Sequence, residues 1–180
     1  MTRTTRASDD DFSDYVASRI ERVRFTAYLL CGDWHEAEDI AQAAFVKLYV
    51  AWNRIDHGEP IDAYVHKVVV RSFLNERRGL WRKLERLTHS PPEPPPPPVD
   101  APEDRIVVWQ ALSQVPSRQR AVLVLRFWED LSLTETAEVL GCSVGTVKSQ
   151  CSRGLRTLRE ILDRNGAEAT MTLSARKARA

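Results

Sequence analysis

A run of basic and small polar residues near the C-terminus is the clearest candidate for a binding surface. At about 100° per residue, a helix over residues 144–162 divides into two arcs. One arc is apolar and is expected to face the core: Val144, Val147, Cys151, Leu155, Leu158 and Leu162. The opposite arc carries cations and hydroxyl groups: Lys148, Ser149, Ser152, Arg153, Arg156 and Arg159. Such side chains suit DNA, because cations pair with phosphates and both kinds bond to base edges. The alternative is the solvated charged face of an ordinary helix.

A short turn and a second predicted helix stand directly before this segment. Apolar residues recur through residues 134–140, and Gly141, Cys142 and Ser143 form the connection. A three-residue turn that opens with glycine is typical of a helix-turn-helix, and Ser143 is a suitable N-cap. In that motif the first turns of the second helix reach bases and later cations hold the backbone. This division places Lys148, Ser149, Ser152 and Arg153 at bases, and Arg156 and Arg159 at phosphates.

A second basic stretch lies in the N-terminal half. Seven Lys and Arg stand against two Glu between residues 67 and 86, although the net charge of the chain is only +1. Two separate basic stretches on a nearly neutral chain indicate two DNA contacts and weak binding by the isolated protein. Trp52, Tyr64 and Trp81 are aromatic candidates for stacking on exposed bases. For Trp52 the alternative is a place in the core.

Residues for catalysis or metal binding form no pattern in this sequence. There is no Gly-rich phosphate loop, no Ser-His-Asp arrangement and no carboxylate pair with a plausible pocket. The three cysteines and four histidines are scattered, which disfavours a disulfide framework and a metal site. No apolar run reaches the length of a membrane span, and the N-terminus is polar. We therefore expect a cytoplasmic protein that is not an enzyme, carries no cofactor and does not insert into membranes.

The elements that must position these residues are helices on either side of a proline-rich linker. Residues 88–103 hold eight of the ten prolines, which block helices and favour an extended linker. A proline-rich ligand for a partner is the other interpretation. Helical periodicity predicts helices over residues 12–30, from the Asp33 cap to Trp52, from Pro60 to about 86, and over 104–115 and 117–129. The prediction is an all-α fold of two small helical domains, 1–87 and 104–162, followed by a disordered tail over 163–180.

Four segments of the sequence resemble conserved regions of bacterial sigma factors. LSLTETAEVLGCSVGTVKSQCSRGLRTLRE (residues 131–160) resembles sigma region 4, and LSQVPSRQRAVLVLRFWEDLS (112–132) is similar to the segment before it. AEDIAQAAFVKLYVAW (37–52) resembles region 2.2, and AYVHKVVVRSFLNERRG (63–79) resembles regions 2.3 and 2.4. With neither region 1 nor a full region 3, the chain resembles the extracytoplasmic-function (ECF) group of the sigma-70 superfamily, in its SigE-like branch.

This resemblance implies an alternative sigma factor that directs RNA polymerase core to promoters. Asp39 and Gln42 match the positions that dock the clamp helices of the largest polymerase subunit, with Ala43 where many members have Glu. The region 2 domain would read and melt the −10 element through Tyr64, Lys67, Arg71, Arg77 and Arg78. Many members have Asn at the position of Arg71. The helix-turn-helix of region 4 would read the −35 element.

The partners implied are core polymerase and promoter DNA, and an anti-sigma factor is left open as a further partner. The alternative function is a stand-alone helix-turn-helix regulator that binds DNA without polymerase, because region-4-like motifs also occur in such proteins. That alternative leaves the region-2-like half unexplained.

Overall fold

The computed structural model describes residues 9–55, 61–84 and 109–177, with side chains for residues 9–55, 61–76 and 109–164. All regular structure within these ranges is helical, as the sequence predicts. Helix α1 (Asp9–Cys31), α2 (Trp34–Ala51) and α3 (Ile61–Leu84) form the N-terminal half. The predicted linker at 88–103 and the side chains of Arg77, Arg78 and Trp81 lie outside the described residues.

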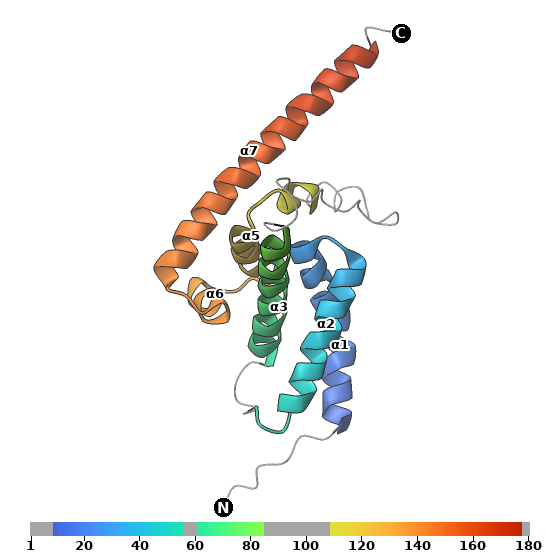
Figure 1. The fold of residues 1–180 in the computed structure, drawn as a ribbon, viewed down its shortest axis with the longest axis vertical. Helices are drawn as coiled ribbons and strands as arrows, with labels where there is room; N and C mark the ends of the chain where they lie inside the picture. The colour runs from blue at the N-terminus through green and yellow to red at the C-terminus, as the bar shows by residue number, and fades with distance from the viewer. Residues whose placement is uncertain (1–8, 56–60, 85–108, 178–180) are drawn as a thin grey trace, which may run out of the picture.

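The C-terminal half begins with a helical segment at 109–113, followed by α5 (Ser117–Leu123) and a π-helical turn, η1 (Val124–Trp128). Helix α6 (Leu133–Leu140) and helix α7 (Val144–Lys177) complete it. Figure 1 shows α6 beside α3, while α7 runs on well past the other helices. In the described part of the chain no helix is long and apolar enough to cross a membrane.

Local capping explains where several helices begin and end. Asp33 accepts a hydrogen bond from the Glu36 N–H at 2.8 Å and caps α2, as predicted. Ser143 likewise accepts from the Thr146 N–H at 3.1 Å at the start of α7. Gly141 ends α6 with a φ of 62°, the left-handed conformation that glycine adopts without strain. The predicted helix-turn-helix is therefore confirmed, including the Ser143 cap and the turn at Gly141.

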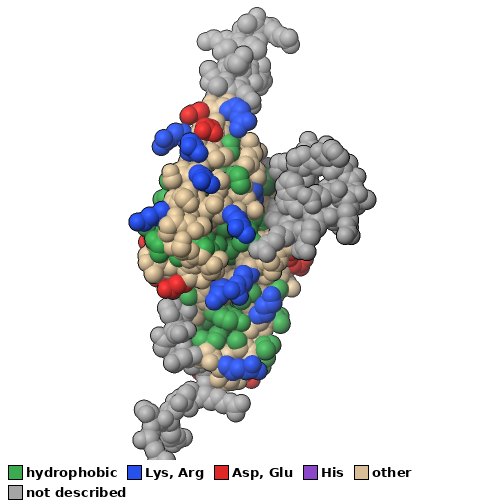
Figure 2. All heavy atoms as spheres, turned by 60° about the vertical axis from the view of Figure 1, so that its left-hand side comes forward, with side chains coloured by type: hydrophobic (Ala, Val, Ile, Leu, Met, Phe, Trp, Pro, Cys, Tyr) green, Lys and Arg blue, Asp and Glu red, His purple; other side chains and the backbone are tan. Residues whose placement is uncertain are grey.

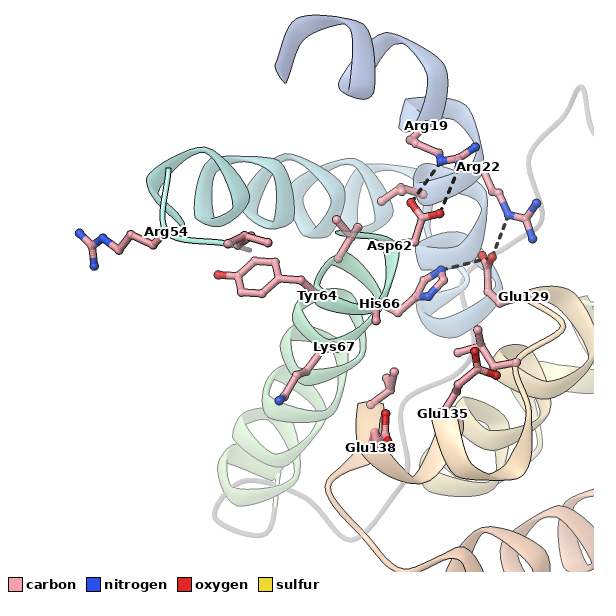
Figure 3. Close-up of a pocket in the computed structure, with 16 residues that line it drawn as sticks. Arg19, Arg22, Arg54, Asp62, Tyr64, His66, Lys67, Glu129, Glu135 and Glu138 are labelled. Atoms are coloured by element: carbon pink, nitrogen blue, oxygen red, sulfur yellow. Dashed lines mark hydrogen bonds and ion pairs between the residues drawn. The ribbon is translucent and has the colours of Figure 1, made fainter. Parts of the chain in front are cut away.

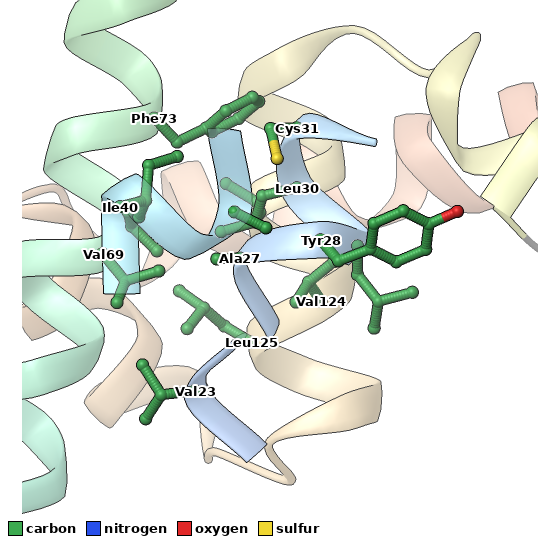
Figure 4. Packing of buried hydrophobic residues seen from close by; sticks show 14 of the residues in the cluster. Val23, Ala27, Tyr28, Leu30, Cys31, Ile40, Val69, Phe73, Val124 and Leu125 are labelled. Atoms are coloured by element: carbon green, nitrogen blue, oxygen red, sulfur yellow. The ribbon is translucent and has the colours of Figure 1, made fainter. Parts of the chain in front are cut away.

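Both halves contribute to one apolar core. Ala27 and Leu30 of α1 are fully buried with Val69 of α3, and the cluster continues into Val124 and Leu125 of η1 and its neighbours. Figure 4 shows Val124 and Leu125 beside these α1 residues. The contact surface between the two halves is called the seam below. Trp52 is also buried, so its interpretation as a core residue is confirmed.

The core face of α7 differs from the predicted arc. Val147 of that arc is buried as predicted, but Leu155 and Leu162 are 41% and 42% exposed, and Ile161, outside the arc, is buried. The physical reason is Gly154, because a Cβ there would lie 3.2 Å from the Leu123 side chain. Helix α5 approaches α7 at this glycine, so the contact face includes Gly154 and leaves Leu155 and Leu162 outside, while Leu158 still packs against the core.

Two further elements depart from the sequence-based expectation. The predicted tail from residue 163 continues α7 to Lys177 and is helical in the structure. The predicted helix at 117–129 is interrupted by the π-helical turn of η1, whose wide hydrogen bond joins the Glu129 N–H to the Val124 carbonyl at 3.1 Å. The π-helical turn leaves no periodicity signal, because residues 117–129 satisfy a helical pattern throughout.

Gly32 connects α1 to α2, and Trp109 of the C-terminal half packs against it. Its φ is 83°, and a Cβ at this position would lie 2.2 Å from the ring of Trp109. The Trp109 ring also stacks on Tyr28 with a centroid distance of 6.0 Å. Glycine is therefore required twice at this position, for its backbone conformation and for the tryptophan that packs on it.

We expect Gly32→Ala to destabilise the chain more than Gly141→Ala. Both positions have positive φ, so each alanine costs about 1 kcal/mol in backbone strain. Only Gly32 adds a clash with an aromatic ring, which should raise its total cost to about 3 kcal/mol or more, since Gly141 has open space at its Cβ position. Urea unfolding of the two variants measures the difference, and equal losses would contradict the role given to Trp109.

Candidate nucleic-acid interface

The cationic face of α7 is fully open to solvent. All six predicted contact residues on this helix are exposed: Lys148, Ser149, Ser152, Arg153, Arg156 and Arg159. In the described part of the chain, none of the four cations forms an ion pair with an acidic side chain. The face of the molecule in Figure 2 carries more Lys and Arg side chains than acidic ones. Unpaired cations on an exposed helix face are available for phosphates.

The second basic surface lies on α3. Tyr64, Lys67 and Arg71 are three and four residues apart and therefore share one face of this helix. Tyr64 and Lys67 are half-buried, and Arg71 is exposed. The Tyr64 hydroxyl donates to the backbone carbonyl of Lys47 at 3.4 Å. The structure thus brings three of the five residues predicted for this surface together.

A stripe on α2 presents polar residues first and apolar residues after them. Asp39 and Gln42 are exposed, as a docking role requires. Val46 and Val50 continue the same stripe and are each 65% exposed. The stripe therefore joins a carboxylate and an amide to an exposed apolar surface, a composition that favours contact with another protein.

An open groove of about 950 Å³ lies between α1, α3 and α6. Tyr64 and Lys67 line it from α3, and Glu135 and Glu138 line it from α6 (Figure 3). Glu135 also completes a capping box at the start of α6, where its carboxylate accepts from the Ser132 N–H at 2.7 Å. The groove is therefore lined by residues of α3 and by two carboxylates from the C-terminal half, and Figure 3 shows Tyr64 and Lys67 pointing away from these carboxylates.

A buried carboxylate lies at the end of this groove, in the seam. Glu129 follows η1 and is 7% exposed. It accepts hydrogen bonds from Arg22 Nε at 2.8 Å and from the Thr26 hydroxyl, both on α1. His66 of α3 lies on its other side, with 3.2 Å between His66 Nε2 and Glu129 Oε2 (Figure 3). These four residues are called the Glu129 cluster below.

The electrostatics of the Glu129 cluster favour the charged carboxylate. Burial opposes ionisation, but the hydrogen bonds from His66, Thr26 and Arg22 outweigh it and lower the pKa of Glu129 from 4.5 to about 2. A second ion pair stands nearby, in which Arg19 of α1 bonds both oxygens of Asp62 on α3 at 3.1 Å. Burial and the Asp62 carboxylate together raise the pKa of the Tyr15 hydroxyl, which donates to Asp62 at 2.7 Å.

Sequence reasoning missed the Glu129 cluster. Glu129 is 107 residues from Arg22 and 103 residues from Thr26, so no local spacing links them. The capping box of Ser132 and Glu135 was also overlooked, although its four-residue signature is present in the sequence.

Comparisons with known proteins cover most of the chain. The family model for sigma-70 region 2 matches residues 15–89, and the model for sigma-70 region 4 matches residues 105–158. The RNA polymerase sigma-E factor of Streptomyces coelicolor is 39% identical over 158 residues, which cover 84% of this chain and 86% of that protein. The ECF RNA polymerase sigma factor SigW of Bacillus subtilis is 27% identical over 189 aligned residues, covering 90% and 94%.

Solved structures share the fold at low sequence identity. The sigma factor RpoE in complex with the anti-sigma factor NepR, from Bartonella quintana, has a TM-score of 0.73 at 22% identity, covering 86% of this chain and 98% of that one. CnrH in complex with the cytosolic domain of CnrY has a TM-score of 0.64 at 22% identity, covering 88% and 91%. At this identity the likeness establishes the arrangement of the helices.

The lowered pKa of Glu129 predicts a specific loss of stability in acid. Because the folded pKa lies below the unfolded value, the charged cluster contributes fully above pH 4.5 and its contribution is lost as the pH falls through about 2. Glu129→Gln should be less stable than the parent at pH 7 and should lose less stability between pH 4.5 and 2. Denaturant unfolding at several pH values measures both. Glu160→Gln, an exposed change on α7, is the control, and parallel curves for all three proteins would be inconsistent with a buried charged Glu129.

Proposed function

The chain belongs to the sigma-70 family as an ECF RNA polymerase sigma factor, and on this premise we propose how its surfaces divide the work of initiation. Helix α7 reads the −35 element, α3 reads and holds the opened −10 element, and the α2 stripe docks core polymerase. The observation that carries the proposal is the open cationic face of α7, on a chain whose two halves both match sigma-70 regions. The polymerase catalyses RNA synthesis, and the chain is a non-enzymatic subunit in the cytoplasm that directs the polymerase to promoters.

The length of the α7 face supports the division between bases and phosphates. From Lys148 to Arg159 the helix rises by about 16 Å, at about 1.5 Å per residue. The major groove is about 12 Å wide, so one end of this face fits among base edges while the other reaches the backbone. Lys148, Ser149, Ser152 and Arg153 lie toward the N-terminal end and are assigned to bases. Arg156 and Arg159 are assigned to phosphates.

The face of α3 has the composition that an unpaired strand requires. Lys67 and Arg71 supply positive charge along the helix, and Tyr64 supplies an aromatic ring beside them. Base stacking on aromatic rings and a cationic track along the backbone are the two features that hold single strands. Arg77 and Arg78 extend the basic stretch in the sequence and complete the proposed −10 surface.

The α2 stripe is proposed to dock the clamp helices of the largest polymerase subunit. Asp39 and Gln42 provide polar contacts. Ala43 cannot make the polar contact that we expect from the Glu found at this position in many members of the family. The exposed Val46 and Val50 continue the stripe, so apolar contact here supplements the polar pair. An anti-sigma factor is a further proposed partner, because RpoE of Bartonella quintana, a solved structure with the same fold, is a sigma factor in complex with the anti-sigma factor NepR.

Co-elution with core polymerase tests the proposal against the stand-alone regulator. A sigma factor should run with core polymerase in gel filtration and confer transcription from a promoter with both elements. A stand-alone regulator should elute separately and bind its DNA tightly without polymerase. The match of residues 15–89 to sigma-70 region 2 favours the first outcome.

Replacing Asp39 and Gln42 with Ala together should weaken binding to core polymerase while helical content stays unchanged, because both side chains are exposed. Val46→Asp should weaken binding further, since it places a charge in the apolar part of the stripe. Ala17→Asp puts the same charge on the exposed side of α1 and is the control. Affinity is measured by pull-down or fluorescence titration, and unchanged binding by the double and the Val46 variants would exclude α2 as the docking surface.

Arg153→Ala and Arg159→Ala should have different effects on −35 recognition. Loss of Arg153 should cost about 1–3 kcal/mol and relax preference at one or two positions. Loss of Arg159 should weaken binding evenly across sequences and lower the salt slope by about one unit. Titration of holoenzyme variants with a panel of −35 duplexes at several salt concentrations measures both effects. A similar shift in sequence preference for the two variants would show that the division of the face is wrong.

A further inference from the structure

Aromatic rings from both halves of the chain form a continuous row. Tyr28 of α1 stacks on Trp34 of α2 with 4.3 Å between ring centroids, and on Trp109 at 6.0 Å. Phe25 extends the row, because its ring lies 6.2 Å from that of Trp34 and 4.8 Å from that of Trp128. These five residues are called the aromatic row below.

One end of the aromatic row is buried and the other is open to solvent. Tyr28 and Trp109 are each 2% exposed, Phe25 and Trp34 are half-buried, and Trp128 is 42% exposed. An exposed indole that continues into two half-buried rings is more than an isolated apolar side chain. Contiguous apolar surface of this kind marks a contact site.

The chemistry of this surface suits a proline-rich ligand. Proline-rich segments dock on surfaces lined with aromatic rings, where their pyrrolidine rings pack against the aromatic faces. Such a segment is held in an extended conformation by its fixed φ angles, so it loses little entropy on docking. An aromatic surface therefore selects this class of ligand over a flexible polar segment.

The chain carries such a ligand close to the row in its own sequence. Seven of the ten prolines stand between residues 91 and 98, and residues 99–108 join this proline run to Trp109. Ten extended residues reach about 35 Å at most, whereas neighbouring rings of the row are only 4.3–6.2 Å apart. The connection is thus long enough to bring the run to the open end of the row.

We propose that in the free chain the proline run of residues 91–98 docks on the open end of the aromatic row, at Trp34, Phe25 and Trp128. A short tether supplies an effective concentration of about 1 mM, so even a weak contact of this kind is populated. Docking covers the exposed indole and keeps the segment against the helices. The proposal does not depend on the roles given to the DNA-contacting surfaces.

Fluorine NMR of the full chain tests the contact from the side of the row. The five tryptophans are labelled with 5-fluorotryptophan and assigned by single Trp→Phe changes. Replacing the seven prolines of the run with alternating Gly and Ser should shift the Trp128 resonance and increase its broadening by a soluble paramagnetic agent. Trp52, which is 3% exposed in the core, should not change. Pro102→Ser, a change in the same segment outside the run, is the matched control and should resemble the parent.

A peptide of residues 88–103, added to the Gly/Ser variant, should return the Trp128 resonance toward its position in the parent. Half of the return should need about 1 mM peptide or less, because docking within the chain requires a dissociation constant below the effective concentration.

Proline labelling tests the same contact from the side of the run. In a chain labelled with carbon-13 proline, Trp128→Leu should shift the resonances of the run. The resonances of Pro60 and Pro116, which stand outside the linker, should stay in place. Because Trp128 is exposed, this variant leaves the core intact and decides the question even if the Gly/Ser variant folds poorly.

Three results would overturn the proposal. The first is a Trp128 resonance that is the same in the parent and the Gly/Ser variant, together with run resonances that ignore Trp128→Leu. The second is a peptide that leaves Trp128 unmoved at several millimolar. The third is a Trp128 resonance that depends on protein concentration, which would show that a second copy of the chain covers the row.

Discussion

Helix α1 is buried on every side at its C-terminal end, and the arrangement of the other helices follows from this. Six consecutive residues, Thr26 to Cys31, are buried there. A helix that packs against one neighbour buries a single stripe, so six consecutive buried positions need cover from opposite directions. Helices α2 and α3 supply one cover, and Trp109, α5 and η1 supply the other. The two halves therefore share one core, although a proline-rich segment separates them in the sequence.

Features that depend on neighbouring residues could be predicted from the sequence. The Asp33 and Ser143 caps, the glycine turn and the exposed cations of α7 all follow from spacing within a few residues, and the structure has each of them. The resemblance to sigma regions 2 and 4 was equally local, because each segment carries its own motif. The roles given to the individual DNA-contacting residues stay predictions.

Features that depend on distant residues could not be predicted. The α7 core face was wrong at Leu155 and Leu162, because the approach of Leu123 to Gly154 decides it and helical periodicity does not contain that information. The Glu129 cluster was missed for the same reason. In the sequence Glu129 resembles any solvated acid, because its partners lie far away in the chain on α1 and α3. Glu129 has a structural role only because it is buried, and it is buried by the contact between the two halves of the chain.

The π-helical turn of η1 determines the direction in which the side chains that follow it point. A turn with an i→i+5 hydrogen bond holds one residue more than an α-helical turn, and here that bond joins Val124 to Glu129. Deleting one residue between them would restore an ordinary helix and rotate the following side chain by about 100°. Glu129 would then leave the seam for solvent. A one-residue deletion in this short stretch would therefore separate Glu129 from Arg22, Thr26 and His66 without changing any other side chain of the cluster.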